Sequence, residues 1–406
     1  MIFILFCLVF TNFNFASEPT IASTAVILME PTTGKILYEK NAYDKMYPAS
    51  TTKILTAILV LENCDLKEKA VVSKNAIFSI PNGYVNCNLH EGEELSVNDL
   101  MYALMVKSAN DAAVVLAEHI GGSVENFADM MNKKAKEMGC KNTHFVNPNG
   151  IHHEDHYSTA YDLAIMAMYG MQNETFRNYV STKSYTLPAT NKHPTADRIC
   201  LTTNDMLRPN SRYYDENVIG IKTGYTTEAR NCLIAGARKN DVELISVTLH
   251  AGTNAEGLSE RYLDTKALFD YGFDNFQFSD IVQEKDIVQT IEIKNGTKDT
   301  KNLDLITKDT LFAYLKKELD LDGLAPSITL HENLEAPIQT GDSLGSITYT
   351  IDGIEYSTEL LAKSNVEKKL NIEIVVLIGG ILLLMFGVMI LKISTKKKVK
   401  KKKFRK

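Results

Sequence analysis

The stretch Pro48-Ala49-Ser50-Thr51-Thr52-Lys53 places a lysine three residues after a serine, at what reads as the start of a helix. Apolar residues follow it at helical spacing, so the sequence predicts Ser50 in the first helical turn and Lys53 one turn on. These apolar residues are Ile54, Leu55, Ile58, Leu59 and Leu61. A hydroxyl and an amine would then share one face near a helix N-terminus, where the field is positive. The string alone is weak, because Ser394-Thr395-Lys396-Lys397 repeats it.

Two further short motifs carry polar side chains. Ser108-Ala109-Asn110 lies between two helical patterns, where side chains can point into a cleft. The pattern Ser-x-Asn also occurs at residues 73–75 and 96–98, so only its position distinguishes the Ser108 motif. Lys222-Thr223-Gly224 is the only Lys-Thr-Gly and ends a run typical of a β-strand. Alone it reads as a plain strand end with an exposed lysine.

Taken in order, Ser-x-x-Lys, Ser-x-Asn and Lys-Thr-Gly resemble the active-site serine penicillin-binding fold. The surrounding residues look like low-molecular-mass D-alanyl-D-alanine carboxypeptidases, the serine peptidase family that trims peptidoglycan stems. The resemblance covers roughly residues 20 to 395. Its longer matching stretches are Pro48–Lys53, Ser108–Ala113, Asn147–Gly150, His156–Ala164 and Gly220–Thr226.

The fold class implied by this resemblance is α+β, with an antiparallel sheet flanked by helices plus a helical subdomain, in a catalytic domain over residues 20–275. Strand patterns at both ends of this region agree, since they predict one sheet closed by distant parts of the chain. The expected strands are 23–29, 36–38, 218–223, 232–238 and 243–249. The expected helices follow Ser50 and Ser96 and cover 111–120, 123–138, 159–171 and 261–271.

Acyl transfer needs a nucleophile, a base and a site for oxyanion charge. Ser50 supplies the hydroxyl, and Lys53 must accept its proton because no histidine has a clear role. This requires a neutral amine, and lowering a lysine pKa from about 10.4 to about 7.5 costs roughly 4 kcal/mol. Partial burial of Lys53 together with the nearby charge of Lys222 is expected to supply this free energy. Ser108 can relay a proton to the leaving D-alanine, and Asn110 can hold Lys53 or the substrate amide.

The resemblance further implies the substrate-binding residues. The backbone N–H groups of Ser50 and Tyr225 would form the oxyanion hole, next to Gly224. Lys222 and Thr223 would bind the terminal carboxylate. Arg261 would either assist them or be a solvated, ion-paired surface residue.

Two residues depart from the family pattern. Tyr225 stands where many members have histidine, which leaves the backbone N–H in place. Arg230 stands where glycine is expected, which puts the shape of the cleft near the motif strand in question.

The predicted activity is a D-Ala-D-Ala carboxypeptidase without cofactor or metal, acting on peptidoglycan stem peptides and acylated by β-lactam antibiotics. The alternatives are a DD-endopeptidase or transpeptidase, a β-lactamase or a penicillin sensor of the same fold. No Glu-x-x-Leu-Asn string of a β-lactamase lies between Asn110 and Lys222. His152, His153 and His156 lack acidic or cysteine partners at zinc spacing, so a structural or loop role is expected for His156.

The remainder of the chain points to a membrane anchor. Residues 281–362 predict a small β-rich domain interrupted by a helix near residues 311–319, followed by a linker over 363–371. Residues 372–393 predict a transmembrane helix, and 394–406 form a basic tail that the positive-inside rule assigns to the cytoplasm. Residues 1–16 resemble a signal peptide, with an uncleaved anchor as the alternative.

Charge and cysteine content limit the remaining possibilities. Removing the ten Lys and Arg of residues 392–406 from 44 leaves 34 against 50 acidic residues, a net charge of −16, which argues against nucleic acid as a partner. Of six cysteines, five follow the predicted signal peptide, at no spacing typical of a disulfide framework or a zinc site. They are expected to be mostly buried free thiols, with one bridge possible.

Overall fold

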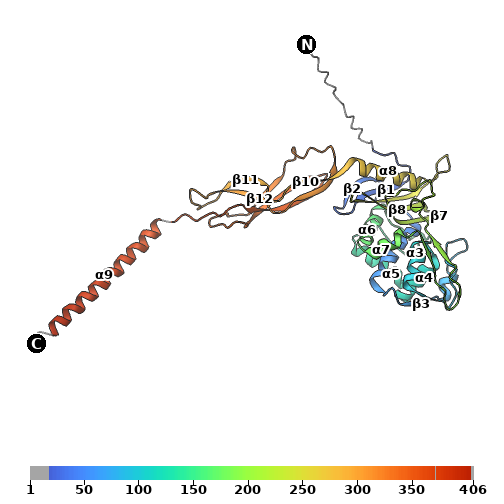
Figure 1. Cartoon of the computed structure of the whole chain (residues 1–406), viewed down its shortest axis with the longest axis horizontal. Coiled ribbons are helices and arrows are strands. Elements are labelled where there is room, and N and C mark those ends of the chain that lie inside the picture. Colours follow the sequence, from blue (N-terminus) through green and yellow to red (C-terminus); the bar gives the residue numbers. More distant parts are fainter. Residues whose placement is uncertain (1–17, 371, 404–406) are drawn as a thin grey trace, which may run out of the picture. The chain divides into compact units, whose positions relative to one another are not determined.

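The computed structural model describes residues 18–370 and 372–403 (Figure 1), so the predicted signal peptide lies outside the described residues. The chain divides into two compact units. Among the described residues, the first unit comprises 18–277 and 314–317, and the second comprises the others. The Ser-x-x-Lys, Ser-x-Asn and Lys-Thr-Gly motifs at Ser50, Ser108 and Lys222 all belong to the first unit.

A five-stranded antiparallel sheet is the centre of the first unit. Its strand order is β2-β1-β9-β8-β7, so a strand from the beginning of the unit pairs with one from near its end, as predicted. The strands are β1 (Ala25–Glu30), β2 (Lys35–Lys40), β7 (Val218–Thr226), β8 (Arg230–Lys239) and β9 (Val242–Ala251). The edge strand β7 carries the Lys-Thr-Gly motif.

Both faces of this sheet are buried. Successive side chains of a strand point to opposite faces, so neighbouring residues of one strand belong to two different cores. Ile27 of β1 and Val247 of β9 belong to a large core shared with the helical subdomain. Leu28 of β1 belongs to a second core with Phe269 of α8 (Glu260–Asn275). The sheet is therefore a fixed base between the helical subdomain and α8 (Figure 1).

The helical subdomain lies between β2 and β7 in the sequence. Its helices start at caps that the sequence provides: Ser96 accepts a hydrogen bond from the Asp99 N–H, and Thr159 from the Asp162 N–H. The helices are α1 (Lys53–Asn63), α2 (Lys74–Phe78), α3 (Val97–Met105), α4 (Asn110–Gly121), α5 (Val124–Glu137), α6 (Ala160–Met171) and α7 (Glu174–Ser181). Shorter elements are η1 (Ala49–Thr52), η2 (Asp205–Leu207), β3 (Lys69–Val71), β4 (Glu94–Ser96), β5 (Ser184–Thr186) and β6 (Ile199–Leu201).

Three predictions of local structure were wrong. Ser50 lies in the 3₁₀ turn η1, and the α-helix begins only at Lys53. The helix expected near residues 311–319 is the strand β13 (Leu311–Lys316), which pairs with β10 (Phe276–Val282). Its residues 313–315 are buried, and tertiary burial outweighs their helical propensity. The first part of the linker expected over 363–371 packs against the second unit, because Val366 is buried and forms a β-bridge with Ile338.

The second unit is β-rich, as predicted. It contains a five-stranded antiparallel sheet in the order β11-β12-β16-β15-β14, with its own apolar core. The strands are β11 (Ile287–Glu292), β12 (Asn302–Thr307), β14 (Ser327–Leu330), β15 (Ser343–Ile351) and β16 (Ile354–Ala362).

Helix α9 (Ile372–Lys403) follows the second unit's sheet. Its segment Val376–Ile393 has 18 residues with a mean hydropathy of 2.6, and none of that segment is buried against the protein. This helix is long and apolar enough to anchor the chain in a membrane.

The five cysteines that the structure describes are free thiols. Cys87 Sγ and Cys200 Sγ lie 3.7 Å apart, which is a contact distance and not a bond. Burial raises the pKa of Cys232 to about 11, so this thiol stays protonated at neutral pH.

Arg230 begins β8 with a φ of 51°, in the left-handed region where side chains with a Cβ are strained. Arg230→Gly is therefore expected to raise the free energy of unfolding by about 0.5–1 kcal/mol, because relief of strain exceeds the added chain entropy. Denaturant titration measures the change. Arg230→Ala keeps the Cβ and should give no such gain, and an equal gain in both variants would contradict the strain argument.

Candidate active site

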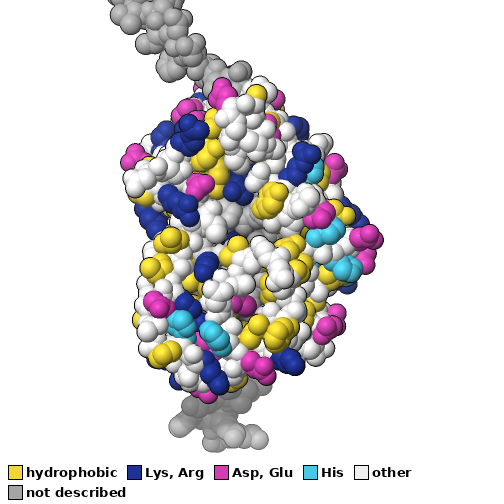
Figure 2. Space-filling model, turned by 90° about the vertical axis from the view of Figure 1, so that its right-hand side faces the viewer, with side chains coloured by type: hydrophobic (Ala, Val, Ile, Leu, Met, Phe, Trp, Pro, Cys, Tyr) yellow, Lys and Arg dark blue, Asp and Glu magenta, His cyan; other side chains and the backbone are white. Residues whose placement is uncertain are grey.

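A cavity of about 440 Å³ lies at the edge of the sheet, between β7 and the helical subdomain. Figure 2 shows the first unit hollowed across the middle of one face. Seven of the nine predicted site residues line the cavity: Ser50, Ser108, Asn110, Thr223, Gly224, Tyr225 and Arg261. The other two, Lys53 and Lys222, are buried side chains that reach Ser50 and Ser108 respectively.

Lys53 Nζ lies 2.9 Å from Ser50 Oγ and is completely buried. It also donates to Asn110 Oδ1 at 2.8 Å and to the Asn149 carbonyl oxygen at 2.6 Å. The Asn110 amide is oriented by its Nδ2, which donates to the Val85 carbonyl oxygen at 2.8 Å. Two of the three oxygens around Nζ can therefore only accept. A neutral amine has two N–H bonds for them, and its lone pair is left for the Ser50 hydroxyl.

The surroundings of Lys53 favour that neutral form. Burial lowers the pKa of Lys53 well below its usual value, and the nearby Lys222 charge lowers it further. Asp111 opposes this shift to a smaller extent. The burial and the second lysine expected from the sequence are thus both present.

Lys222 forms a second pair with Ser108. Its Nζ donates to Ser108 Oγ at 2.9 Å and to the Thr223 carbonyl oxygen at 3.0 Å. Ser108 has a φ of 66°, a strained conformation for a residue with a side chain, at the break between α3 and α4. Burial, and secondarily the charge of Arg261, lower the pKa of Lys222 to about 7. This amine consequently changes its charge within the physiological pH range.

Close backbone packing brings β7 to Ser50. A Cβ at Gly224 would lie 3.0 Å from the Ser50 backbone nitrogen, so only glycine allows this approach without displacement. The neighbouring residue Tyr225 is 64% exposed and lines the cavity. The packing of the strand therefore does not require the histidine that many family members have at this position.

Arg261, at the start of α8, lies at the cavity wall. Its Nη1 donates to the carbonyl oxygens of Gly224 and Cys232 at 3.3 and 3.5 Å, and its Nη2 donates to the Tyr262 hydroxyl at 3.0 Å. These contacts fix a guanidinium beside the Lys-Thr-Gly strand. The alternative of a solvated, ion-paired surface arginine does not fit them.

Sequence reasoning gave no role to several residues of the site. The Asn149 carbonyl oxygen accepts a hydrogen bond from Lys53 Nζ, although in the sequence the stretch Asn147–Gly150 is marked only by the family resemblance. Thr203 Oγ1 lies 2.6 Å from Thr223 Oγ1, and Tyr84 and Val85 form part of the cavity wall. No local signal marked Thr203 or Tyr84, because both reach the site only through the folding of loops.

His156 has the structural role expected for it. Its Nδ1 accepts from the Val146 N–H at 3.2 Å, so its Nε2 carries the proton and donates to Thr52 Oγ1 at 2.8 Å. Burial lowers the pKa of His156 to about 3, which keeps the ring neutral. The ring thereby braces the turn that holds Ser50.

The pKa of Lys222, lowered to about 7, predicts the alkaline side of the pH profile. If its charge attracts the substrate carboxylate, kcat/KM is expected to fall as pH rises through about 7, since this parameter reports groups of the free enzyme. Lys222→Arg should lower kcat/KM but move this decline to higher pH, because a guanidinium stays protonated. A decline at unchanged pH in the variant would assign it to another group.

Comparisons with known proteins agree with this geometry. The family model described as D-alanyl-D-alanine carboxypeptidase matches residues 12–253, and that of the penicillin-binding protein 5 C-terminal domain matches 276–368. The chain is 34% identical over 359 residues to D-alanyl-D-alanine carboxypeptidase DacF of Bacillus subtilis, covering 87% of this chain and 86% of the relative.

Solved structures show the same similarity. Penicillin-binding protein 5 from Haemophilus influenzae superposes with a TM-score of 0.67 and 28% identity, over 87% of this chain and all of that one. A DD-transpeptidase from Streptomyces gives a TM-score of 0.57 and 33% identity, over 64% of this chain and 99% of that one. With these matches over both units, the chain belongs to the D-alanyl-D-alanine carboxypeptidase family of serine peptidases.

Proposed function

We propose that this protein removes the terminal D-alanine from peptidoglycan stem peptides ending in D-Ala-D-Ala, through an acyl-enzyme on Ser50. The observation that carries this proposal is the Ser50 Oγ to Lys53 Nζ distance of 2.9 Å, with the amine buried and the hydroxyl facing a cavity. Family membership supports the substrate class and acylation by β-lactam antibiotics.

The first chemical step follows from the hydrogen bonds around Lys53. The neutral amine accepts the Ser50 proton, and Oγ attacks the carbonyl carbon between the two D-alanines. The developing oxyanion is held by the backbone N–H groups of Ser50 and Tyr225, an arrangement that the close approach of Gly224 supports. One such donor is typically worth about 10²- to 10³-fold in rate.

Departure of D-alanine needs a proton on its nitrogen. The proton that Lys53 took from Ser50 is returned to the D-alanine nitrogen as the C–N bond breaks, which leaves Lys53 neutral again. Ser108 lies at the cavity wall and bonds Lys222, so it is suited to relay this proton to the leaving D-alanine. Water then attacks the acyl-enzyme carbonyl while Lys53 accepts one of its protons. The bond from that carbonyl to Ser50 Oγ breaks, and Lys53 returns the proton to Oγ, which releases the shortened peptide and restores Ser50.

The substrate carboxylate is assigned to the cationic side of the cavity. Thr223 and Arg261 both line it, and the buried Lys222 Nζ lies 3.0 Å from the Thr223 carbonyl oxygen. In an exterior of net negative charge, these local cations are needed to hold an anionic substrate. No cofactor enters the proposed reaction.

Transfer of the acyl group to an amine is a second candidate, which the likeness to the Streptomyces DD-transpeptidase favours. Both reactions share the acyl-enzyme and differ in the acceptor that reaches it. An endopeptidase reaction would use the same residues on a crosslinked peptide.

The activity assay uses the protein and a peptide ending in D-Ala-D-Ala, with free D-alanine as the readout. Adding an acceptor amine separates hydrolysis from transfer, because transfer gives a peptide of higher mass. Intact-mass spectrometry after penicillin treatment should show one adduct, mapped to Ser50. Rapid penicillin turnover without D-alanine release would favour a β-lactamase, and a stable adduct without D-alanine release would favour a penicillin sensor.

Anchoring by α9 supports a location at the cell membrane. We propose that residues 20–275, the catalytic domain, and 281–362, the small β-rich domain, lie outside the cytoplasm. Residues 372–393 would cross the membrane and 394–406 face the cytoplasm. A cysteine added after residue 406 should be protected from a membrane-impermeant maleimide in intact cells, and its labelling there would reverse this topology.

A further inference from the structure

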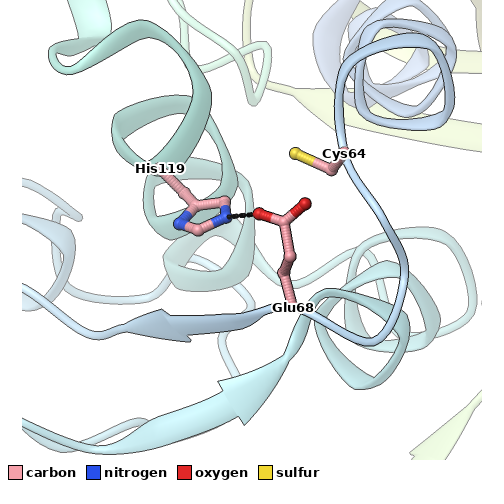
Figure 3. Close-up of side chains that lie close together, drawn as sticks. All are labelled: Cys64, Glu68 and His119. Carbon is pink, nitrogen blue, oxygen red and sulfur yellow. Dashed lines mark hydrogen bonds and ion pairs between the residues drawn. The ribbon is translucent and has the colours of Figure 1, made fainter.

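Three potential metal ligands meet at the end of the helical subdomain away from the nucleophile (Figure 3): Cys64, Glu68 and His119. Cys64 is the C-terminal cap of α1, and His119 lies in the last turn of α4. Glu68 directly precedes β3. In Figure 3 the Cys64 thiol and the His119 ring both face the Glu68 carboxylate.

The donor atoms are close enough for one ion. Cys64 Sγ, one Glu68 oxygen and one His119 ring nitrogen all lie within 4.8 Å of one another. His119 Nε2 and Glu68 Oε2 are 3.1 Å apart, near the separation of two ligands on a tetrahedral ion. Ligands of one tetrahedral zinc ion lie about 3.3–3.5 Å apart, so side-chain rotations would have to bring the three atoms from within 4.8 Å of one another to that separation.

The backbone holds Glu68 in this place. Its Oε1 accepts a hydrogen bond from the Asp65 N–H at 2.8 Å, and its own N–H donates to the Asp65 carbonyl oxygen at 3.0 Å. The oxygen Oε2, which faces His119, is therefore held toward the site by a closed turn. Fixed outer contacts of this kind orient metal ligands.

We propose that Cys64, Glu68 and His119 form a binding site for Zn²⁺ or a divalent ion of similar preference, with water as the fourth ligand. Thiolate and imidazole donors favour zinc over Ca²⁺ or Mg²⁺, which take oxygen ligands. The Glu68 side chain is 49% exposed and that of His119 is 23% exposed, so an ion and its water can enter from solvent.

The site would connect two helices that also meet at the catalytic centre. Helix α1 begins with Lys53 and ends at the Cys64 cap, and α4 begins with Asn110 and carries His119 in its last turn. Lys53 Nζ donates to Asn110 Oδ1 at the nucleophile end of this helix pair. A bound ion would tie the other ends together, so its main effect should be on stability. The spacing of the three residues in the sequence gave no indication of this site.

The test uses the purified protein, freed of metal with a chelator, and Co²⁺ as a spectroscopic probe for zinc. Titration should give a near-ultraviolet thiolate-to-cobalt absorption band that saturates at one ion per chain, and Zn²⁺ should remove it. Zn²⁺ at 100 times its Kd should also raise Tm by about 5–10 °C. The change on adding zinc is compared within each variant, so differences in metal-free stability cancel.

Two variants decide the location. Cys64→Ser should remove the thiolate band, and His119→Ala should weaken binding at least tenfold. Cys140→Ser is the matched control, because Cys140 is a half-buried free thiol outside the cluster, and it should leave the band unchanged. The proposal would be overturned by a band that survives Cys64→Ser, or by the absence of a band at Co²⁺ concentrations up to about 1 mM. His119 and Glu68 would then form an ordinary ion pair.

Discussion

Ser50→Ala is expected to reduce D-alanine release to background, Lys53→Met to lower kcat/KM by about 10²- to 10⁴-fold, and the double variant to lose no more than Ser50→Ala. The reason is that the two residues act as one unit. With Lys53 Nζ 2.9 Å from Ser50 Oγ, the amine accepts the proton of Ser50 in acylation and that of water in deacylation, and both steps require the Ser50 hydroxyl. Without the hydroxyl, the base has nothing to act on.

The measurements are D-alanine release and the rate of penicillin adduct formation for the four proteins of this cycle. Adduct formation isolates the acylation step, and it should slow in Lys53→Met by the same factor as kcat/KM. Thermal unfolding should confirm that each variant is folded. Methionine replaces the lysine at similar volume, although Asn110 Oδ1 and the Asn149 carbonyl each lose a donor.

A control for this pair is present in the chain itself. Ser394 and Lys397 have the same Ser-x-x-Lys spacing in α9, so Ser394→Ala with Lys397→Met should leave activity unchanged. Strictly additive losses in the Ser50 and Lys53 variants would contradict a shared proton transfer, and another base would then have to be sought.

Gly150→Ala is expected to lower the free energy of unfolding by about 2–5 kcal/mol, through positive-φ strain and overpacking together. Gly150 has a φ of +82°, and a Cβ built there would lie 1.8 Å from the Ala49 carbonyl oxygen. That oxygen belongs to the backbone immediately before Ser50, so it cannot move without moving the nucleophile. A further loss of kcat/KM is expected even where the variant is fully folded.

Gly139→Ala separates the two causes. Gly139 has a similar φ of +85°, but no atom lies within 4 Å of the added Cβ. Its substitution should cost only the strain, about 1 kcal/mol, with no change in kcat/KM. Denaturant titration and D-alanine release measure both effects. Equal losses of stability in the two variants would show that the backbone at Ala49 can move aside at little cost, which would contradict the overpacking argument.

The sequence alone was sufficient for the order of the elements that carry the motifs. Helix caps such as Ser96 and Thr159, apolar residues at helical spacing and alternating strand runs are local signals, and local signals depend little on the rest of the chain. The three motifs in order indicated the family, and the family indicated the fold. That strands from both ends of this region share one sheet was likewise predictable, because strand patterns flank the helical region; which strands pair was not.

Tertiary structure decided what depends on contacts between distant residues. Burial made β13 a strand where its residues read as a helix, and it set the pKa of Lys222 to about 7. The Asn149 carbonyl reaches Lys53, and Thr203 reaches Thr223, through loops whose path no local pattern specifies. The physical reason is the same in each case: desolvation, close packing and hydrogen bonds across the fold are set by which residues become neighbours, and residue spacing alone does not contain that information.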